Sequence, residues 1–208
     1  MTGEKYVIKS FAGIKNGKIL LNGIMLHESG QLNFDEMMDE VYRKLNLAYP
    51  KFHKMDQLSK LGFMTSEFLL RDQKLTDEYE ADKIGIVPSN KSSSLDTDLK
   101  YQSMLDKGVA SPAVFVYTLP NILIGELCIR NKIKGESIFF ISDRYNINQQ
   151  VDYMLLLLNT GVIDACIAGW VEFIQGKYES FLYLVTKGDD QSGEEFSPVS
   201  VKKMFNQI

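Results

Sequence analysis

Short apolar runs alternate with longer amphipathic segments along most of this chain. Apolar residues in short or alternating runs predict strands, and apolar residues every three to four positions predict helices. The runs predict strands over residues 6–14, 18–26, 83–87, 137–142, 164–173 and 180–186. The helical spacing predicts helices over residues 35–45, 56–73, 96–105, 121–132 and 148–160.

This alternation predicts an α/β fold with a mixed, mostly parallel sheet flanked by helices. Asn16-Gly17 favours a tight hairpin between the first two strands, and the short Gln175-Gly176-Lys177 connection makes the last strand antiparallel. We expect a single domain over 1–208, with an N-terminal hairpin over about 6–26, a core over about 50–186 and a C-terminal tail over about 187–208. In that tail the segment 187–197 reads as a loop, and 198–208 as one short helical turn with little order.

Polar signals mark the ends of several elements. Asn33 or Asp35 is suited to cap the helix over 35–45, and Asn121 to cap the helix over 121–132. The serine-rich loop 89–94 lies between a strand and a helix, where backbone N–H groups can bind an anion. It lacks the glycine spacing of a phosphate-binding loop, which favours an ordinary polar loop.

Composition and charge narrow the class of protein. The 208 residues are 45% hydrophobic and 24% charged, typical of a globular domain, and the net charge of −4 gives no basic footprint for nucleic acid. An acidic carrier protein would be repelled unless its docking face is locally basic. Cys128 and Cys166 have no metal-ligand spacing and predict small buried residues of a reduced, cytoplasmic protein. No secretion signal opens the chain, and polar residues interrupt the apolar stretch 153–173, which argues against a membrane span.

The segment 111–142 carries the most specific motifs. It reads Ser111-Pro112-x-x-Phe115, Leu119-Pro120-Asn121, Gly125-Glu126-x-x-Ile129-Arg130, then Gly135 and a short apolar strand. This order resembles the β-ketoacyl synthase family, a branch of the thiolase-like condensing enzymes. The start of the helix over 56–73, with Met55 and Asp56 after basic residues, is similar to the first core helix of that family. The resemblance covers residues 50–186 and implies one half of a thiolase-like fold.

In that family the strand runs into a turn that presents a catalytic cysteine, and the resemblance places Arg144 at that position. A guanidinium stays protonated and is no nucleophile. The other catalytic groups of the family come from the second half of its fold, and His27 and His53 lie before the nucleophile position. We therefore expect no condensation by this chain on its own, and no cofactor or metal.

Arg144 has alternative interpretations: an exposed turn residue, a cation that fills the former acyl tunnel, or a contact for phosphopantetheine or a carrier carboxylate. The apolar strand 137–142 would lie at a sheet edge, where an unpaired strand is a liability that favours a partner. The resemblance implies that this region lies near a twofold interface. The candidate interface or tunnel residues are Phe115, Tyr117, Asn121, Ile124, Cys128, Phe139 and Phe140.

Two functions fit this pattern. The first is a non-catalytic partner subunit, similar to a chain-length factor, that pairs with a full β-ketoacyl synthase in fatty acid, polyketide or aryl polyene-type synthesis. Such a subunit could also meet an acyl carrier protein. The alternative is a stand-alone homodimeric module that binds an acyl chain or small molecule. A third interpretation, new chemistry at Asp143, Arg144 and Tyr145, requires a site that the sequence does not display.

Overall fold

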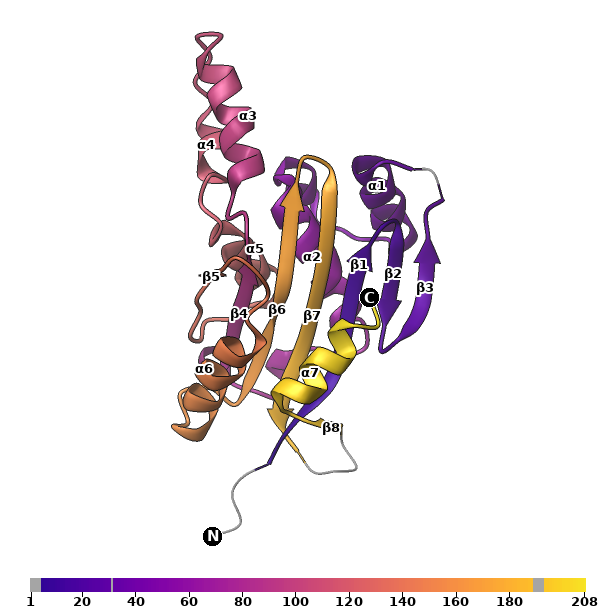
Figure 1. The fold of residues 1–208 in the computed structure, drawn as a ribbon, viewed down its shortest axis with the longest axis vertical. Coiled ribbons are helices and arrows are strands. Elements are labelled where there is room, and N and C mark those ends of the chain that lie inside the picture. The colour runs from indigo at the N-terminus through magenta and orange to yellow at the C-terminus, as the bar shows by residue number, and fades with distance from the viewer. Residues whose placement is uncertain (1–4, 31, 189–192) are drawn as a thin grey trace.

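In a computed structural model, which describes residues 5–30, 32–188 and 193–208, one sheet forms the middle of three layers (Figure 1). Its strands follow the order β3-β2-β1-β7-β6-β4-β5, and β8 pairs with β1. The strands are β1 (Tyr6–Lys15), β2 (Lys18–Leu21), β3 (Ile24–Glu28), β4 (Ile84–Asn90), β5 (Phe140–Ile141), β6 (Ala165–Ile174), β7 (Lys177–Lys187) and β8 (Glu194–Glu195). The α/β class with a mixed sheet flanked by helices is confirmed.

The balance of pairing differs from the expectation of a mostly parallel sheet. Only β4 pairs in parallel, with β5 and β6, and the remaining pairings are antiparallel. Tight two-residue turns join β1 to β2, β2 to β3 and β6 to β7, and such turns allow only antiparallel neighbours. Parallel pairing is confined to the part of the chain where helices cross between strands.

The predicted strand over 18–26 is in fact two strands. A second Asn-Gly turn, Asn22-Gly23, divides it, and both residues have positive φ (51° and 78°) as Asn16 and Gly17 do (49° and 78°). Positive φ at both central residues is the geometry that matches the twist of antiparallel strands. The hairpin therefore extends the same sheet by a further edge strand, β3.

The five predicted helices are present with modest shifts at their ends: α1 (Phe34–Lys44), α2 (Gln57–Leu69), α3 (Leu95–Leu105), α5 (Ile122–Asn131) and α6 (Ile147–Asn159). The structure adds α4 (Pro112–Val116), which was not predicted, and α7 (Pro198–Phe205), with short 3-10 turns at Pro50–Lys54, Leu75–Asp77 and Ala81–Lys83. Asn33 caps α1 in a capping box with Glu36. Asp56 caps α2, which ends four residues earlier than expected. Asn121 begins α5 but makes no side-chain capping bond, so that expectation is wrong.

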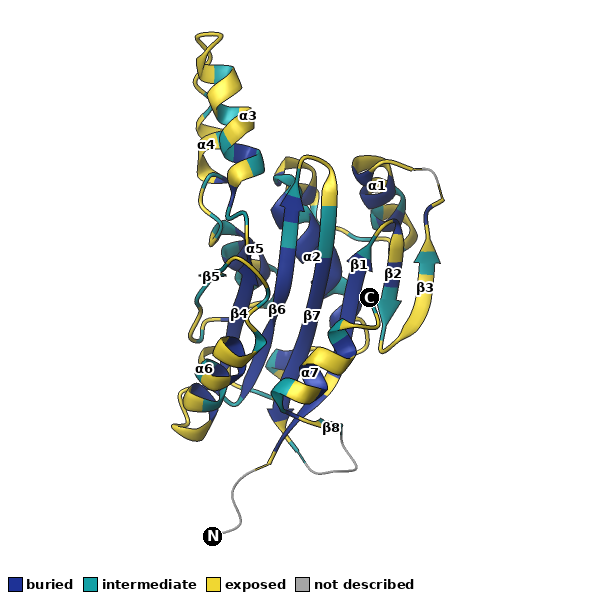
Figure 2. Ribbon diagram, in the orientation of Figure 1, coloured by how far each residue is buried: buried dark blue, intermediate teal, exposed yellow. Residues whose placement is uncertain are grey.

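Each face of the sheet has its own apolar core. On one face, side chains from α1, α2 (among them Phe63 and Met64) and α5 pack against the sheet residue Leu182. On the other face, side chains from α6 and α7 pack against the sheet residues Phe181 and Tyr183. Figure 2 shows the buried residues concentrated along β1, β7, β6 and β4. Two covered faces explain why the central strands are apolar on both sides rather than alternating.

The C-terminal tail is better ordered than its sequence predicts. Ser197 caps α7 through the backbone N–H of Ser200, and Val201 and Met204 are buried on the sheet. The helix thus covers β1 and β7, where a single loose turn was expected. Residues 189–192 of the predicted polar loop lie outside the described residues.

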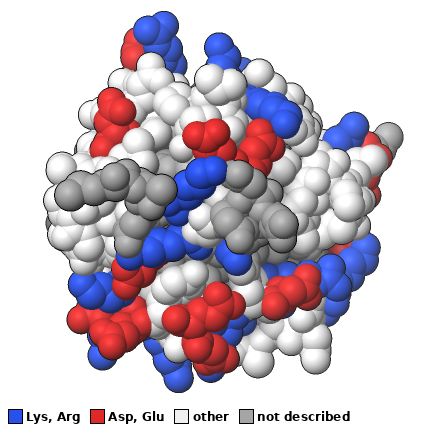
Figure 3. Space-filling view, turned by 90° about the horizontal axis from the view of Figure 1, so that it is seen from below, with Lys and Arg blue, Asp and Glu red and all other residues white. Residues whose placement is uncertain are grey.

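Three general properties can be stated for the described residues: helix length, surface charge and the grouping of candidate metal ligands. Within the described ranges, no helix is long and apolar enough to cross a membrane. Lys and Arg lie among Asp and Glu on the face seen in Figure 3, rather than in one basic block. The same described residues contain no cluster of three or more candidate metal ligands.

Candidate functional site

A helical arm extends beyond the sheet on the side of β5. It consists of α3, α4 and their connection, and Figures 1 and 2 show it projecting upward with many exposed residues. Its large exposed apolar residues are Leu95, Leu99, Leu105, Val109, Phe115 and Val116, and Leu119 follows just after α4. Phe115 is 54% exposed, and among the described residues its ring meets only that of Tyr101, at a centroid distance of 5.5 Å. A concentration of exposed apolar side chains on one element marks a surface suited to contact with another molecule.

Hydrogen bonds join the two ends of the arm to each other and to the body. The Ser94 hydroxyl donates to the Thr118 carbonyl over 2.5 Å, which ties the start of α3 to the end of α4. The Thr97 hydroxyl donates to the Asp56 carboxylate over 2.8 Å. Tyr117, the third anchor, donates to Glu126 over 2.9 Å, and burial together with that contact raises the pKa of its phenol. The arm is therefore held in one orientation from its base.

The charged residues of the 125–130 motif are structural ties. Glu126 is buried (2% exposed) and accepts from Lys51 over 2.9 Å as well as from Tyr117. Arg130 donates through Nε and Nη2 to both carboxylate oxygens of Glu67, over 2.6 and 2.8 Å, and so locks α5 onto α2. The motif positions α5 and, through it, the arm and the strand that follows.

The strand predicted over 137–142 lies at the edge of the sheet, as expected. Its regular part is shorter, since only Phe140–Ile141 pair continuously with β4, after an isolated bridge between Ser137 and Ile86. β5 is the end of the strand order, so among the described residues no strand covers its outer side. Phe139 packs on the core under α5 and Phe140 on the core under α6. Ile141 is 55% exposed beside them.

The sequence candidates thus divide into two groups. Phe115 belongs to the exposed arm, and Phe139 and Phe140 flank the open edge. Tyr117 and Ile124 are core residues that support the arm rather than present a surface. Cys128 is half-buried in an apolar depression beside Ile129, and burial raises the pKa of its thiol, which argues against an activated nucleophile. The exposed leucines and valines of the arm were missed, because their spacing looks like that of core residues.

Arg144 lies in the exposed turn between β5 and α6. Its carbonyl accepts from the Ser142 hydroxyl over 2.7 Å, and its side chain makes no ion pair with the described residues. The next residue, Tyr145, turns inward and packs against Trp170 and Phe205 at ring distances of 5.5 and 5.1 Å. The turn therefore presents one cation to solvent and one aromatic ring to the core.

A buried hydrogen-bond network holds the start of α6 on the sheet. Gln150, which is 1% exposed, accepts from Tyr145 over 2.6 Å and from Tyr183 over 2.9 Å. Its amide donates to the carbonyls of Val87 over 2.7 Å and Gly169 over 3.0 Å. Burial raises the pKa of both tyrosines, so their hydroxyls stay protonated donors. Sequence reasoning missed this network, although a glutamine in helical register with apolar core residues is a signal for it.

The serine-rich loop is not an open anion site. The backbone N–H groups of Lys91 and Ser92 both donate to one carboxylate oxygen of Glu172, over 2.7 and 3.1 Å. A side chain of the protein therefore occupies the donors that an anion would need. The interpretation as an ordinary polar loop agrees with this geometry.

Comparisons with known proteins identify structures that share this fold. No family sequence model matches the chain, and neither does any curated protein sequence. Among solved structures, a complex of a ketosynthase with its chain length factor from Xenorhabdus doucetiae matches with a TM-score of 0.57 and 16% identity, over 89% of this chain and 80% of that one.

Two further structures agree. The ishigamide ketosynthase/chain length factor matches with a TM-score of 0.61 and 16% identity, over 92% of this chain and 64% of that one. A β-ketoacyl synthase from Burkholderia phymatum matches with a TM-score of 0.63 and 12% identity, over 89% and 59%. The chain thus spans about three fifths of the length of these two proteins. At such identities the likeness shows the fold, which is that of the thiolase-like ketosynthases.

Proposed function

We propose that this chain is a non-catalytic partner subunit, comparable to a chain-length factor, that associates with a β-ketoacyl synthase in fatty acid, polyketide or aryl polyene-type synthesis. The observation that carries the proposal is the conjunction of the open β5 edge and the apolar arm on one side of the molecule. Two of the similar structures, in which a ketosynthase is paired with a chain length factor, support it.

The lack of catalysis belongs to the same proposal. Arg144, which the sequence motif aligns with the nucleophile, lies in the turn after the edge strand, and a guanidinium cannot form a thioester. Both cysteines are remote from this turn: Cys166 is fully buried in β6, and Cys128 lies on α5. In the complex, the partner synthase would supply the thiolate.

The proposed interface is tested by co-expression of the tagged chain with the full-length ketosynthase encoded nearest to it, followed by light scattering on the eluted species. We expect a one-to-one complex. Replacing Phe115 or Ile141 with serine should weaken it by roughly tenfold, the effect of a typical central interface residue. Val199→Ser is the matched control, because Val199 is 77% exposed on α7 and lies away from β5.

Two results would contradict the proposal. One is a stable homodimer that ignores the ketosynthase, which would instead favour the stand-alone binding module. The other is a complex that loses as much affinity from Val199→Ser as from the arm and edge variants. Product analysis adds a second readout: if Phe115 reaches the acyl tunnel of the complex, Phe115→Ala should lengthen the product.

A further inference from the structure

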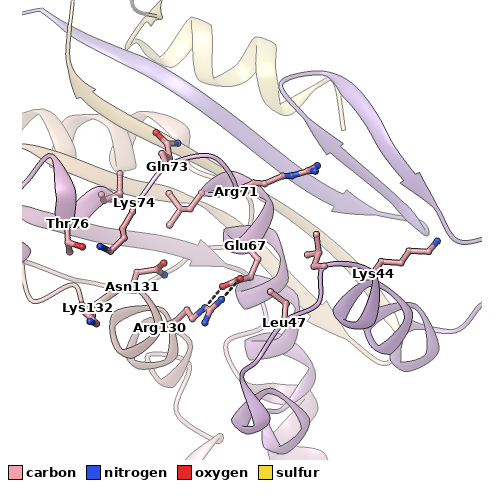
Figure 4. Close-up of a pocket in the computed structure, with 13 residues that line it drawn as sticks. Lys44, Leu47, Glu67, Arg71, Gln73, Lys74, Thr76, Arg130, Asn131 and Lys132 are labelled. Carbon is pink, nitrogen blue, oxygen red and sulfur yellow. Dashed lines mark hydrogen bonds and ion pairs between the residues drawn. The ribbon is translucent and has the colours of Figure 1, made fainter.

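A basic pocket lies on the outer side of α2 and α5, away from the turn that carries Arg144. Its volume is about 470 Å³, within the range of small-molecule sites. The C-terminal ends of α1, α2 and α5 converge on it, as Figure 4 shows. Its walls contain five cations, Lys44, Arg71, Lys74, Arg130 and Lys132, and a single carboxylate, Glu67.

The positive charge of this pocket exceeds what the helix ends require. Each helix C-terminus carries about half a negative charge, so three ends offset at most about one and a half of the cations. Glu67 is fully engaged with Arg130 through both of its oxygens. Lys44 and Lys74 pair with Glu40 and Asp77, so a smaller positive excess, carried by Arg71 and Lys132, remains in a protein whose overall charge is −4.

Lys44 is engaged with Glu40 over 2.5 Å, whereas the other four cations keep donors for a ligand. Within the described residues, Arg71 and Lys132 make no ion pair. Lys74 pairs with Asp77 over 2.5 Å, but both side chains are more than 60% exposed, and such pairs contribute little. Arg130 uses Nε and Nη2 for Glu67, which holds its planar guanidinium rigid and leaves Nη1 for an oxygen ligand.

The surroundings favour a small ligand over an acidic protein surface. Three exposed carboxylates lie within or directly after segment 70–76, which lines the pocket: Asp72, Asp77 and Glu78. An acidic helix that contacts this segment would meet these like charges, whereas a compact anion needs to contact only the cations. In the view of Figure 4, Lys74, Lys132 and Arg130 lie on one side of the pocket, and Arg71 and Lys44 extend outward.

We propose that this pocket binds a small polyanion of the phosphate class, carrying two or more negative charges. Guanidinium and ammonium groups arranged around a concavity are the usual recognition elements for such oxygens. Lys132 and Lys74 would act as point charges, and Arg130 would fix the orientation of one phosphate group. This site is separate from the proposed β5 interface, so either can fail without the other.

The test is isothermal titration of the full chain with pyrophosphate at low salt, beside inorganic phosphate and an oligoglutamate peptide. We expect pyrophosphate to bind more tightly than either. Lys132→Gln and Lys74→Gln should each weaken it by roughly tenfold, as for the loss of one charge-assisted hydrogen bond. Lys202→Gln on α7 is the matched control, since α7 packs on the opposite face of the sheet.

Thermal melts of each variant without ligand separate lost binding from lost folding. Unchanged melting with weaker pyrophosphate binding supports the site. Three results overturn it: no measurable pyrophosphate binding, equal weakening by Lys202→Gln, or tighter binding of the oligoglutamate peptide, which would assign the pocket to an acidic partner.

Discussion

Gln150→Leu tests the buried network beneath α6 most directly. The substitution keeps the side-chain size but leaves the hydroxyls of Tyr145 and Tyr183 without their acceptor and the Val87 carbonyl without its amide donor. Gly169 retains a hydrogen bond from Ser89 over 2.9 Å. Each buried polar group left without a hydrogen bond lowers the free energy of unfolding by about 1–3 kcal/mol, and burial of the leucine side chain offsets about 1–2 kcal/mol of the total. We expect a net loss of about 3 kcal/mol.

Urea denaturation followed by tryptophan fluorescence measures this loss, since Trp170 contacts Tyr145. Gln149→Leu is the matched control, because Gln149 is exposed on the same helix and should change stability by less than about 0.5 kcal/mol. Tyr183→Phe should cost about 1 kcal/mol in the native background and almost nothing when it is combined with Gln150→Leu. Equal costs in both backgrounds, or a loss below about 1 kcal/mol for Gln150→Leu alone, would refute the network.

Three further predictions concern stability. Glu67→Ala leaves Arg130 without its carboxylate partner and should lower the free energy of unfolding, measured in urea, by about 2 kcal/mol. An effect no larger than that of replacing an exposed glutamate would count against a stabilising Glu67–Arg130 ion pair. Burial raises the pKa of Asp56 in the folded state, so the folded protein holds that proton more tightly than the unfolded chain does. The free energy of unfolding should therefore fall as pH rises from about 4. Asp56→Asn should remove this slope, and parallel stability–pH curves for the two proteins would contradict the prediction. Gly169→Ala should lower Tm strongly, because its Cβ would clash with the Phe181 carbonyl oxygen. An unchanged melting temperature would contradict this and show that the strand can shift.

The sequence predicted most elements because their signals are local. Asn16-Gly17 lies between two apolar runs and so predicts a turn. Asn22-Gly23 interrupts what looks like a single apolar run, and the turn there was therefore not predicted. The excess of antiparallel pairing follows from that missed turn and from the order of strands, which no local pattern encodes. α7 was underestimated because a short helix gains its stability from tertiary packing, here from Val201 and Met204 against the sheet.

The candidate site was predictable in part. The motifs over 111–142 located the edge strand, but not what their charged residues do, because the partner of Arg130, Glu67, is 63 residues away in the chain. The apolar positions of the arm have the spacing of core residues, and only the fold shows that no sheet lies beneath them. The loop 89–94 and Glu172 are likewise joined only in three dimensions.

The attachment of the arm has a consequence for hydrogen exchange. Its ties to the body lie at Asp96, Thr97 and Tyr117, and residues 103–112 project beyond them (Figure 1). Segments with few buried contacts open locally at a small free-energy cost, while central strands exchange only on global unfolding. The amides of α3 and α4 should therefore exchange far earlier than those of β6 and β7, and a bound partner would appear first as slower exchange in this one segment.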